Sequence, residues 1–174
     1  MTCAGGWPLL VMLYGSVVAD MPTMTTAEEV ETWREHLVDS REGIKRVLAD
    51  TKRVAVIGIK EGDHRPAFFV PEYAQRAGLE IVPVPVYYPD ATEMLGEKVY
   101  RTVSSIPGDI DMVNVFRKPQ DIPQHLDDII AKKPKTVWFQ LGIRNDDAAE
   151  RLAREGIDVV QDRCLLVELR RIGR

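Results

Sequence analysis

The chain has 174 residues, enough for one domain with a core of its own and too few for two domains of ordinary size. Hydrophobic residues make up 45% of it and charged residues 29%, which is the mix of a globular protein. The formal net charge of −4 argues against a general DNA- or RNA-binding protein, because such a protein needs surplus lysine and arginine to neutralise phosphates. A local basic pocket for one small anion remains compatible with this charge.

The cysteines and histidines give no sign of a metal site or of a disulfide framework. Cys3 and Cys164 lie far apart and form no C-x-x-C pair, and His36, His64 and His125 have no metal-ligand spacing. We therefore predict no bound metal, free thiols and a reducing, cytoplasmic compartment.

Residues 1–24 differ in composition from the rest of the chain. Ala4–Ala19 is apolar and uncharged, but it is shorter than the roughly 20 residues of a membrane-spanning helix, so no membrane segment is predicted. It resembles the apolar part of a signal peptide, with Val17–Ala19 as a cleavage site, yet no lysine or arginine precedes it. Three interpretations stay open: a disordered or non-native leader with translation starting at Met21 or Met24, an export signal, or an ordered extension.

The segment 25–50 predicts two helices that pack on the domain after it. Thr26 and Glu29 have the spacing of a capping box, which indicates a helix over 27–39. A second helical segment follows directly. The apolar residues at helical spacing are Val30, Trp33, Leu37 and Val38 in the first helix and Ile44, Val47 and Leu48 in the second.

From residue 51 to residue 174, short β-branched runs alternate with helical patterns. Between the second and third runs, 85–107 is typical of a loop, with a turn of helix around Ser104. Pro66 suits the start of the first helix here, but Pro71 does not suit a helix interior, so that helix starts near Pro71 or kinks there. The expected strands are 53–58, 79–84, 111–116, 136–141 and 157–160, and the expected helices are one that ends before Gly78, then 119–131, 146–155 and 165–171.

This alternation predicts an α/β fold, a Rossmann-like, doubly wound parallel sheet of about five strands with helices on both faces. In such sheets the ligand lies beyond the carboxyl ends of the strands, at the point where the strand order reverses. The segments that follow the strands are therefore the places to look for a binding site.

Four of the five expected strand ends carry lysine or arginine, although the chain is acidic overall. Helix N-termini also point their free N–H groups toward this edge, which favours anions. The pattern indicates a phosphorylated ligand; the alternative is a set of solvated loop charges. The basic residues are Lys60 and Arg65 after the first strand, Arg117 and Lys118 after the third, Arg144 after the fourth and Arg163 after the fifth.

The usual nucleotide motifs are missing from these ends. Gly58-Ile59-Lys60 has only one glycine of the G-x-G-x-x-G fingerprint, and the second strand is followed by Pro85 and Val86 instead of an acidic residue for a ribose hydroxyl. A Walker-type phosphate loop is absent as well. A standard NAD enzyme is therefore disfavoured.

The segment from Val54 to Leu169, about two-thirds of the chain, resembles the stand-alone CoA-binding domain family, whose fold is similar to the CoA-binding domain of the succinyl-CoA synthetase α subunit. Each matching piece is short, and their common order and spacing carry the resemblance. The pieces are VAVIG at Val54–Gly58, RPA at Arg65–Ala67, LGEKVY at Leu95–Tyr100, VNVFRKP at Val113–Pro119, WFQLGI at Trp138–Ile143 and DRC at Asp162–Cys164.

The resemblance implies a coenzyme A that lies across the strand ends. Its phosphates would meet the loop from Gly58 to Arg65, and its adenosine or pantetheine part would pass the turn after the second strand. Its pantetheine end would lie beside the fourth strand, with Cys164 nearby. The cofactor-binding residues expected on this basis are Gly58, Ile59, Lys60, Arg65, Pro66, Val84, Pro85, Val86, Phe116, Arg117, Gln140 and Gly142.

The sequence departs from the family pattern at two places. The family's first loop usually runs Gly-small-Ser, whereas this chain has Gly58-Ile59-Lys60. The family's second strand usually ends Val-Asn-Pro, whereas this chain has Val84-Pro85-Val86. Each change removes an expected polar partner of the ligand, and Lys60 can replace one of them as a point charge for phosphate.

No catalytic residue is expected. The sequence places no carboxylate or nucleophile beside His64, and Cys164 is expected to be a buried structural thiol, with a reactive thiol as the alternative. The α subunit uses a phosphorylated histidine in a further domain that this chain lacks, so a full ligase reaction is not expected.

These residues favour a non-catalytic carrier, sensor or regulator that binds CoA or an acyl-CoA as its small-molecule partner, without nucleic acid or membrane. Two other functions stay open: a component of a nucleotide-dependent ligase or oxidoreductase, and an interaction module with a vestigial pocket. Homo-oligomer formation also stays open.

Overall fold

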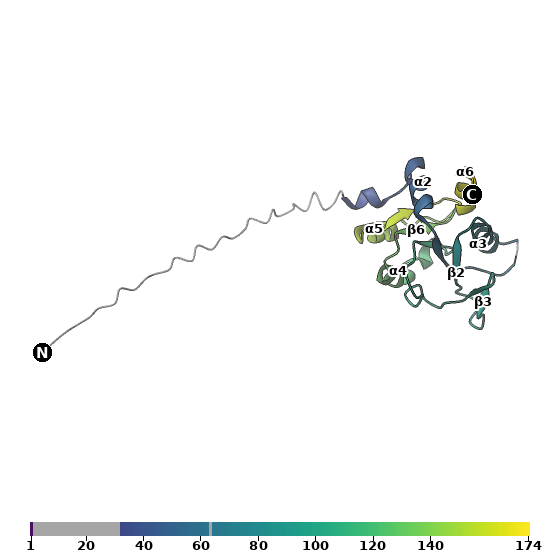
Figure 1. The fold of residues 1–174 in the computed structure, drawn as a ribbon, viewed down its shortest axis with the longest axis horizontal. Coiled ribbons are helices and arrows are strands. Elements are labelled where there is room, and N and C mark those ends of the chain that lie inside the picture. The colour runs from purple at the N-terminus through teal and green to yellow at the C-terminus, as the bar shows by residue number, and fades with distance from the viewer. Residues whose placement is uncertain (2–31, 63) are drawn as a thin grey trace.

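The computed structural model describes residue 1 and residues 32–62 and 64–174 (Figure 1). The three interpretations of residues 1–24 and the capping box at Thr26 therefore fall outside the described part of the chain. Within that part, no helix is both long enough and apolar enough to cross a membrane.

The centre of the molecule is a five-stranded parallel sheet, as the alternating sequence pattern predicts. Each strand is a short run rich in β-branched residues, which suits a strand covered on both faces. The strand order is β2-β1-β5-β6-β7. The bounds are β1 Arg53–Ile57, β2 Glu80–Val84, β5 Met112–Val115, β6 Thr136–Phe139 and β7 Asp158–Val160.

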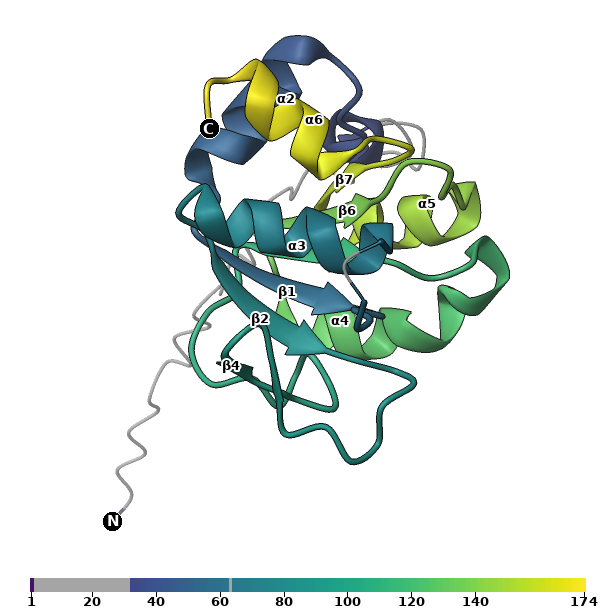
Figure 2. The same cartoon turned by 90° about the vertical axis from the view of Figure 1, so that its right-hand side faces the viewer.

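Helices cover both faces of this sheet (Figure 2). One face carries α2 (Arg41–Asp50), α3 (Pro66–Arg76) and α6 (Leu165–Arg171). The other face carries α4 (Leu126–Lys132) and α5 (Asp146–Arg154). The fold is therefore the Rossmann-like, doubly wound α/β arrangement that the sequence predicts.

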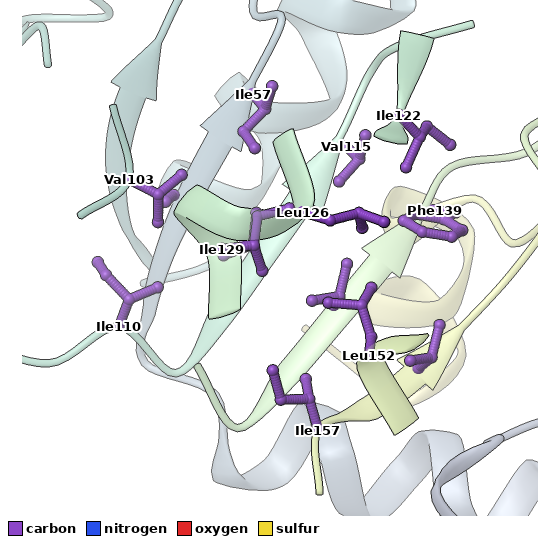
Figure 3. Packing of buried hydrophobic residues seen from close by; sticks show 14 of the residues in the cluster. Ile57, Val103, Ile110, Val115, Ile122, Leu126, Ile129, Phe139, Leu152 and Ile157 are labelled. Atoms are coloured by element: carbon purple, nitrogen blue, oxygen red, sulfur yellow. The ribbon is translucent and has the colours of Figure 1, made fainter. Parts of the chain in front are cut away.

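Two apolar layers, one on each face, form the core. Trp138 and Phe139 are adjacent in β6 and both fully buried, and they belong to opposite layers because neighbouring strand residues point to opposite faces. Figure 3 shows the layer under α4 and α5, where Leu126 and Ile129 of α4 and Leu152 of α5 pack over the strands.

The strand order reverses between β1 and β5. The chain passes from β1 to β2 on one side and then returns to place β5 on the other side of β1. The carboxyl ends of β1 and β5 therefore diverge into loops that leave in opposite directions, and this is the place where such sheets bind ligands.

The predicted helix over 27–39 is wrong in its last residues. The described part contains a short 3-10 helix, Trp33–His36, after which the chain turns extended. Leu37 forms a bridge with Val159, and the Val38 amide donates to the Val159 carbonyl at 2.8 Å. Helical periodicity at these positions is overridden because the exposed edge of β7 offers backbone partners from far along the chain.

The predicted helix over 119–131 is wrong in its first half. Two 3-10 turns, Pro119–Asp121 and Pro123–His125, precede α4. The backbone bonds here span three residues, such as that from the His125 amide to the Ile122 carbonyl at 2.9 Å, and Pro123 has no N–H group that could donate to the carbonyl four residues before it.

The segment 85–107, expected to be loop, contains a small hairpin of β3 (Glu93–Met94) and β4 (Glu97–Lys98). The uncertainty at Pro71 is resolved in favour of a helix that starts at Pro66 and continues through Pro71.

Candidate functional site

Gly58 closes the end of β1 tightly against β5. Its φ is +78°, and a Cβ added to it would lie 2.4 Å from the Phe116 carbonyl oxygen. Its amide donates to the Val84 carbonyl at 2.9 Å, so the residue also holds the end of β2. Only glycine fits this conformation and this spacing, which explains the glycine at the end of the first strand.

A hydrogen bond joins the loop after Gly58 to α3, and Pro71 leaves the carbonyl that accepts it free. A proline has no N–H group, so the Ala67 carbonyl lacks its usual helical donor. The Lys60 amide donates to this carbonyl at 3.2 Å. The proline inside α3 therefore leaves an acceptor that positions the backbone of Lys60 at the carboxyl edge.

A cleft of about 380 Å³ opens over the carboxyl ends of β1, β5 and β6. Four basic residues and no acidic residue of the described chain line it. A larger hollow of about 470 Å³ lies between α2 and α6, away from the strand ends. The lining of the cleft at the strand ends is Lys60, Arg65, Pro66, Ala67, Phe116, Arg117, Lys118, Pro119, Gly142 and Ile143.

Arg117 is the most constrained of the four cations, with an exposed fraction of only 7%. One terminal nitrogen donates to the Tyr87 hydroxyl at 2.9 Å, and the other pairs with the Asp121 carboxylate at 3.2 Å. Its Nε is buried and has no hydrogen-bond partner among the described residues. Buried donors are normally satisfied, so this unpartnered Nε–H is an unmet hydrogen-bond donor at the wall of the cleft.

Tyr87 lies between two cations. The Lys60 ammonium is 5.0 Å from the centre of its ring, and the Arg117 guanidinium carbon is 5.3 Å from it. Both distances are in the range of cation–π contacts. Sequence reasoning did not pair Tyr87 with these residues, because their proximity depends on the path of the turn after β2.

The structure brings six of the twelve expected residues into the cleft: Lys60, Arg65, Pro66, Phe116, Arg117 and Gly142. The side chains of Ile59 and Val84 are buried in the two core layers instead, so only their backbones reach the edge. Pro85 is buried as well, and Val86 is exposed but is not among the lining residues.

Gln140 also turns away from the cleft. It is 4% exposed, its Nε2 donates to the Asn114 Oδ1 at 2.9 Å, and its Oε1 accepts from the Leu165 amide at 3.3 Å. Gln140 thus ties β6 to β5 and to the first residue of α6. Sequence reasoning missed Asn114, although an asparagine inside an apolar central strand is a signal of a buried polar contact.

His125 is half-buried near Arg117, and its buried Nε2 has no partner among the described residues. Burial, and then the charge of Arg117, lower the pKa of its imidazole, against the opposing charges of Asp128 and Asp121. A neutral imidazole beside Arg117 leaves the positive charge of the cleft to the lysines and arginines that line it.

The other reactive residues do not gather around the cleft. His64 is exposed in the loop before α3. Cys164 is a free, half-buried cysteine that packs on the core layer under α2, α3 and α6, so it is less buried than expected. Among the described residues, no group of three or more histidine, cysteine or acidic side chains is arranged to hold a metal ion.

Comparison with known proteins finds relatives in sequence and in fold. The uncharacterised protein YneT of Bacillus subtilis is 34% identical over 128 residues, which cover 74% of this chain and 93% of YneT. A solved structure from Thermus thermophilus has a TM-score of 0.73 at 33% identity and covers 77% of this chain and 99% of its own.

A second solved structure, the dinucleotide-forming acetyl-coenzyme A synthetase 1 of Ca. Korarchaeum cryptofilum, shares the fold alone. Its TM-score is 0.56 at 20% identity, with 64% of this chain and 26% of that chain covered. The family model described as a CoA binding domain matches residues 52–170, the whole sheet with its helices from α3 to α6. The chain therefore belongs to the CoA binding domain family.

Proposed function

We propose that the chain binds coenzyme A or an acyl-CoA across the carboxyl ends of β1, β5 and β6, as a non-catalytic carrier, sensor or regulator. The observation that carries this proposal is the charge of the cleft, where Lys60, Arg65, Arg117 and Lys118 gather in an acidic chain. Coenzyme A carries a pyrophosphate and a ribose phosphate, and charge-assisted hydrogen bonds to such groups are about twice as strong as neutral ones.

The chemistry of the lining fits both halves of this ligand. The buried Nε of Arg117 needs an acceptor, and a phosphate oxygen is one. Pro66, Phe116 and Ile143 give the same cleft an apolar wall against which a pantetheine chain can pack. A site with a few charged groups in an otherwise apolar hollow is typical of cofactor binding.

The two departures from the family pattern have different consequences. Lys60, which stands in place of a small polar residue, lines the cleft and adds a positive charge to it. Pro85, which stands in place of asparagine, is buried outside the lining and has no side-chain polar group to offer. The phosphate end of the site is therefore strengthened, whereas no residue of the lining takes over the role of the missing asparagine.

Isothermal titration tests the proposal, with CoA and acetyl-CoA as ligands and NAD and ADP as controls. We expect micromolar binding of CoA that NAD and ADP do not match. Arg65→Ala should weaken CoA binding by about 1–3 kcal/mol, the range for a lost charged hydrogen bond. Arg76→Ala is the matched control, because Arg76 lies at the far end of α3 and pairs with Glu72 on the surface.

Two results would contradict the proposal. Absence of CoA binding to the wild-type protein would remove CoA as the ligand. Turnover of an acyl-CoA by the purified protein would replace the carrier or sensor by an enzyme.

A further inference from the structure

We propose that Tyr87 is a built-in substitute for a phosphate group, which the ligand displaces when Arg117 exchanges the tyrosine hydroxyl for a phosphate oxygen. This inference rests on the proposed function of the cleft and names the residue that regulates access to its cations. Tyr87 follows β2, whereas Arg117 follows β5, so their hydrogen bond spans the crevice at the end of β1.

The contacts of Tyr87 are those that an anion would make. Its hydroxyl accepts a hydrogen bond from Arg117, and the negative face of its ring lies near both Lys60 and Arg117. The ring thus offsets the repulsion between two cations that the fold holds close together. A phosphate group does the same with a full negative charge, so it is the stronger partner for both residues.

Tyr87 can leave because other segments anchor its backbone, whereas its side chain is held by Arg117 and Lys60, the two residues that the phosphate takes over. Before it, the Gly58 amide binds the Val84 carbonyl at 2.9 Å. After it, Arg101 donates to the carbonyls of Tyr88 and Pro89 at 2.8 and 2.7 Å. The Tyr87 residue is 54% exposed, so rotation of the side chain alone uncovers the guanidinium, with no opening of the turn.

Arg117 itself does not move in this exchange. Its carboxylate partner Asp121 holds the other end of the guanidinium, and a Cβ on Gly58 would lie 3.2 Å from the Arg117 Cδ, so the arginine stem runs close over the glycine. The guanidinium therefore offers the nitrogen released by Tyr87 to the incoming phosphate from a fixed position.

Tyr87→Phe separates the hydroxyl from the ring. Phenylalanine keeps the ring beside the two cations but removes the acceptor, so the substitution takes away a hydrogen bond that only the free protein makes. We expect CoA, and inorganic pyrophosphate as a minimal probe, to bind about three- to tenfold tighter, the effect of one hydrogen bond that water partly replaces. Tyr100→Phe is the control, because Tyr100 lies near Lys98 outside the cleft.

CoA and pyrophosphate are each titrated into the wild type, Tyr87→Phe and Tyr100→Phe, and the affinities distinguish the possible results. The Nε–H signal of Arg117, identified by its disappearance in Arg117→Lys, is followed in the ¹H–¹⁵N spectrum and should shift when pyrophosphate is added. Tighter pyrophosphate binding to Tyr87→Phe without any CoA binding supports the exchange but rejects the proposed function. Equal or weaker binding of pyrophosphate to Tyr87→Phe than to the wild type overturns the exchange, whatever CoA does.

Discussion

At the scale of single residues, the carboxyl end of β1 depends on Gly58, because any side chain at this position would collide with the backbone that follows β5. Gly58 and Gly142 both follow strands and both have a φ of +78°. A Cβ at Gly58 would meet the Phe116 carbonyl oxygen at 2.4 Å, whereas a Cβ at Gly142 would meet no atom within 4 Å. The two glycines therefore share one conformational requirement and differ only in steric room.

This difference gives a prediction about stability. Gly142→Ala should cost about 1–2 kcal/mol in the free energy of unfolding, the cost of a left-handed conformation for a residue with a side chain. Gly58→Ala should cost this amount plus another 1–3 kcal/mol or so, because the end of β5 must also move away. Urea unfolding of both variants measures the two values, and equal costs would mean that β5 yields to the methyl group without resistance.

At the scale of elements, Asn145 joins the start of α5 to the wall of the cleft. Its Oδ1 accepts from the Ala148 amide at 2.9 Å as the helix cap, and its Nδ2 donates to the Pro119 carbonyl at 2.8 Å. Pro119 lines the cleft and follows Arg117 and Lys118. The cap of one helix thus also fixes the segment that carries two of the four cations.

Removal of this side chain should therefore cost more than removal of an ordinary cap. Ser40 caps α2 through one bond, from the Gly43 amide at 3.1 Å, so Ser40→Ala is the matched control, with an expected loss of about 1 kcal/mol. Asn145→Ala should lose about 2 kcal/mol, since it breaks a cap and a second hydrogen bond. Thermal or urea unfolding compares them, and equal losses would show that the bond to Pro119 adds no stability.

The elements also show what the sequence can predict. The five strands are recognisable because strands covered on both faces must be apolar throughout, so Val54–Ile57 and Thr136–Phe139 stand out from the amphipathic helices. The topology of the sheet brings two of the four basic strand ends, those after β1 and β5, into one cleft, whereas Arg144 and Arg163 do not line it. The error at Leu37 arises because helical spacing does not reveal that β7, far along the chain, offers it a backbone partner. The error at Pro123 arises because the same spacing does not distinguish α-helical from 3-10 hydrogen bonding.

The site was less predictable than the fold for a related reason. Sequence order shows that Gln140 and Arg117 follow strands, but it does not show where their side chains point. Gln140 finds buried partners in Asn114 and the Leu165 amide, whereas Arg117 reaches across the crevice to Tyr87. Both outcomes depend on contacts between residues 25 to 30 positions apart, which the sequence alone does not bring together.

At the scale of the whole molecule, the carboxyl ends and the amino ends of the parallel strands carry different kinds of contacts. The carboxyl edge holds the cations of the cleft, while the amino edge is fastened by Asp111, directly before β5. One of its oxygens accepts from the Lys52 and Arg53 amides at 3.1 and 3.0 Å, and the other pairs with the Lys135 ammonium at 2.7 Å. This carboxylate therefore connects the starts of β1, β5 and β6.

These contacts make stability depend on pH in a definite direction. Burial of Asp111 raises its pKa and is the largest single effect, but the hydrogen bonds from Lys135, Arg53 and Lys52 together outweigh it, so the pKa lies below the usual value of 3.8. A carboxyl group with a lowered pKa in the folded state adds stability that is complete above pH 3.8 and is lost as the pH falls through the folded value.

Asp111→Asn should accordingly lose about 1–2 kcal/mol of unfolding free energy at pH 7, because a neutral amide replaces a charged acceptor of three hydrogen bonds. The difference from the wild type should shrink steadily as the pH falls below 3.8, since the wild-type carboxyl then becomes neutral as well. Urea unfolding between pH 7 and pH 2.5 or so measures the difference, with the exposed Asp90→Asn as control. A difference that stays constant over this range would mean that the Asp111 variant is weakened by altered packing at the amino edge, and that its charge contributes nothing to holding the three strands together.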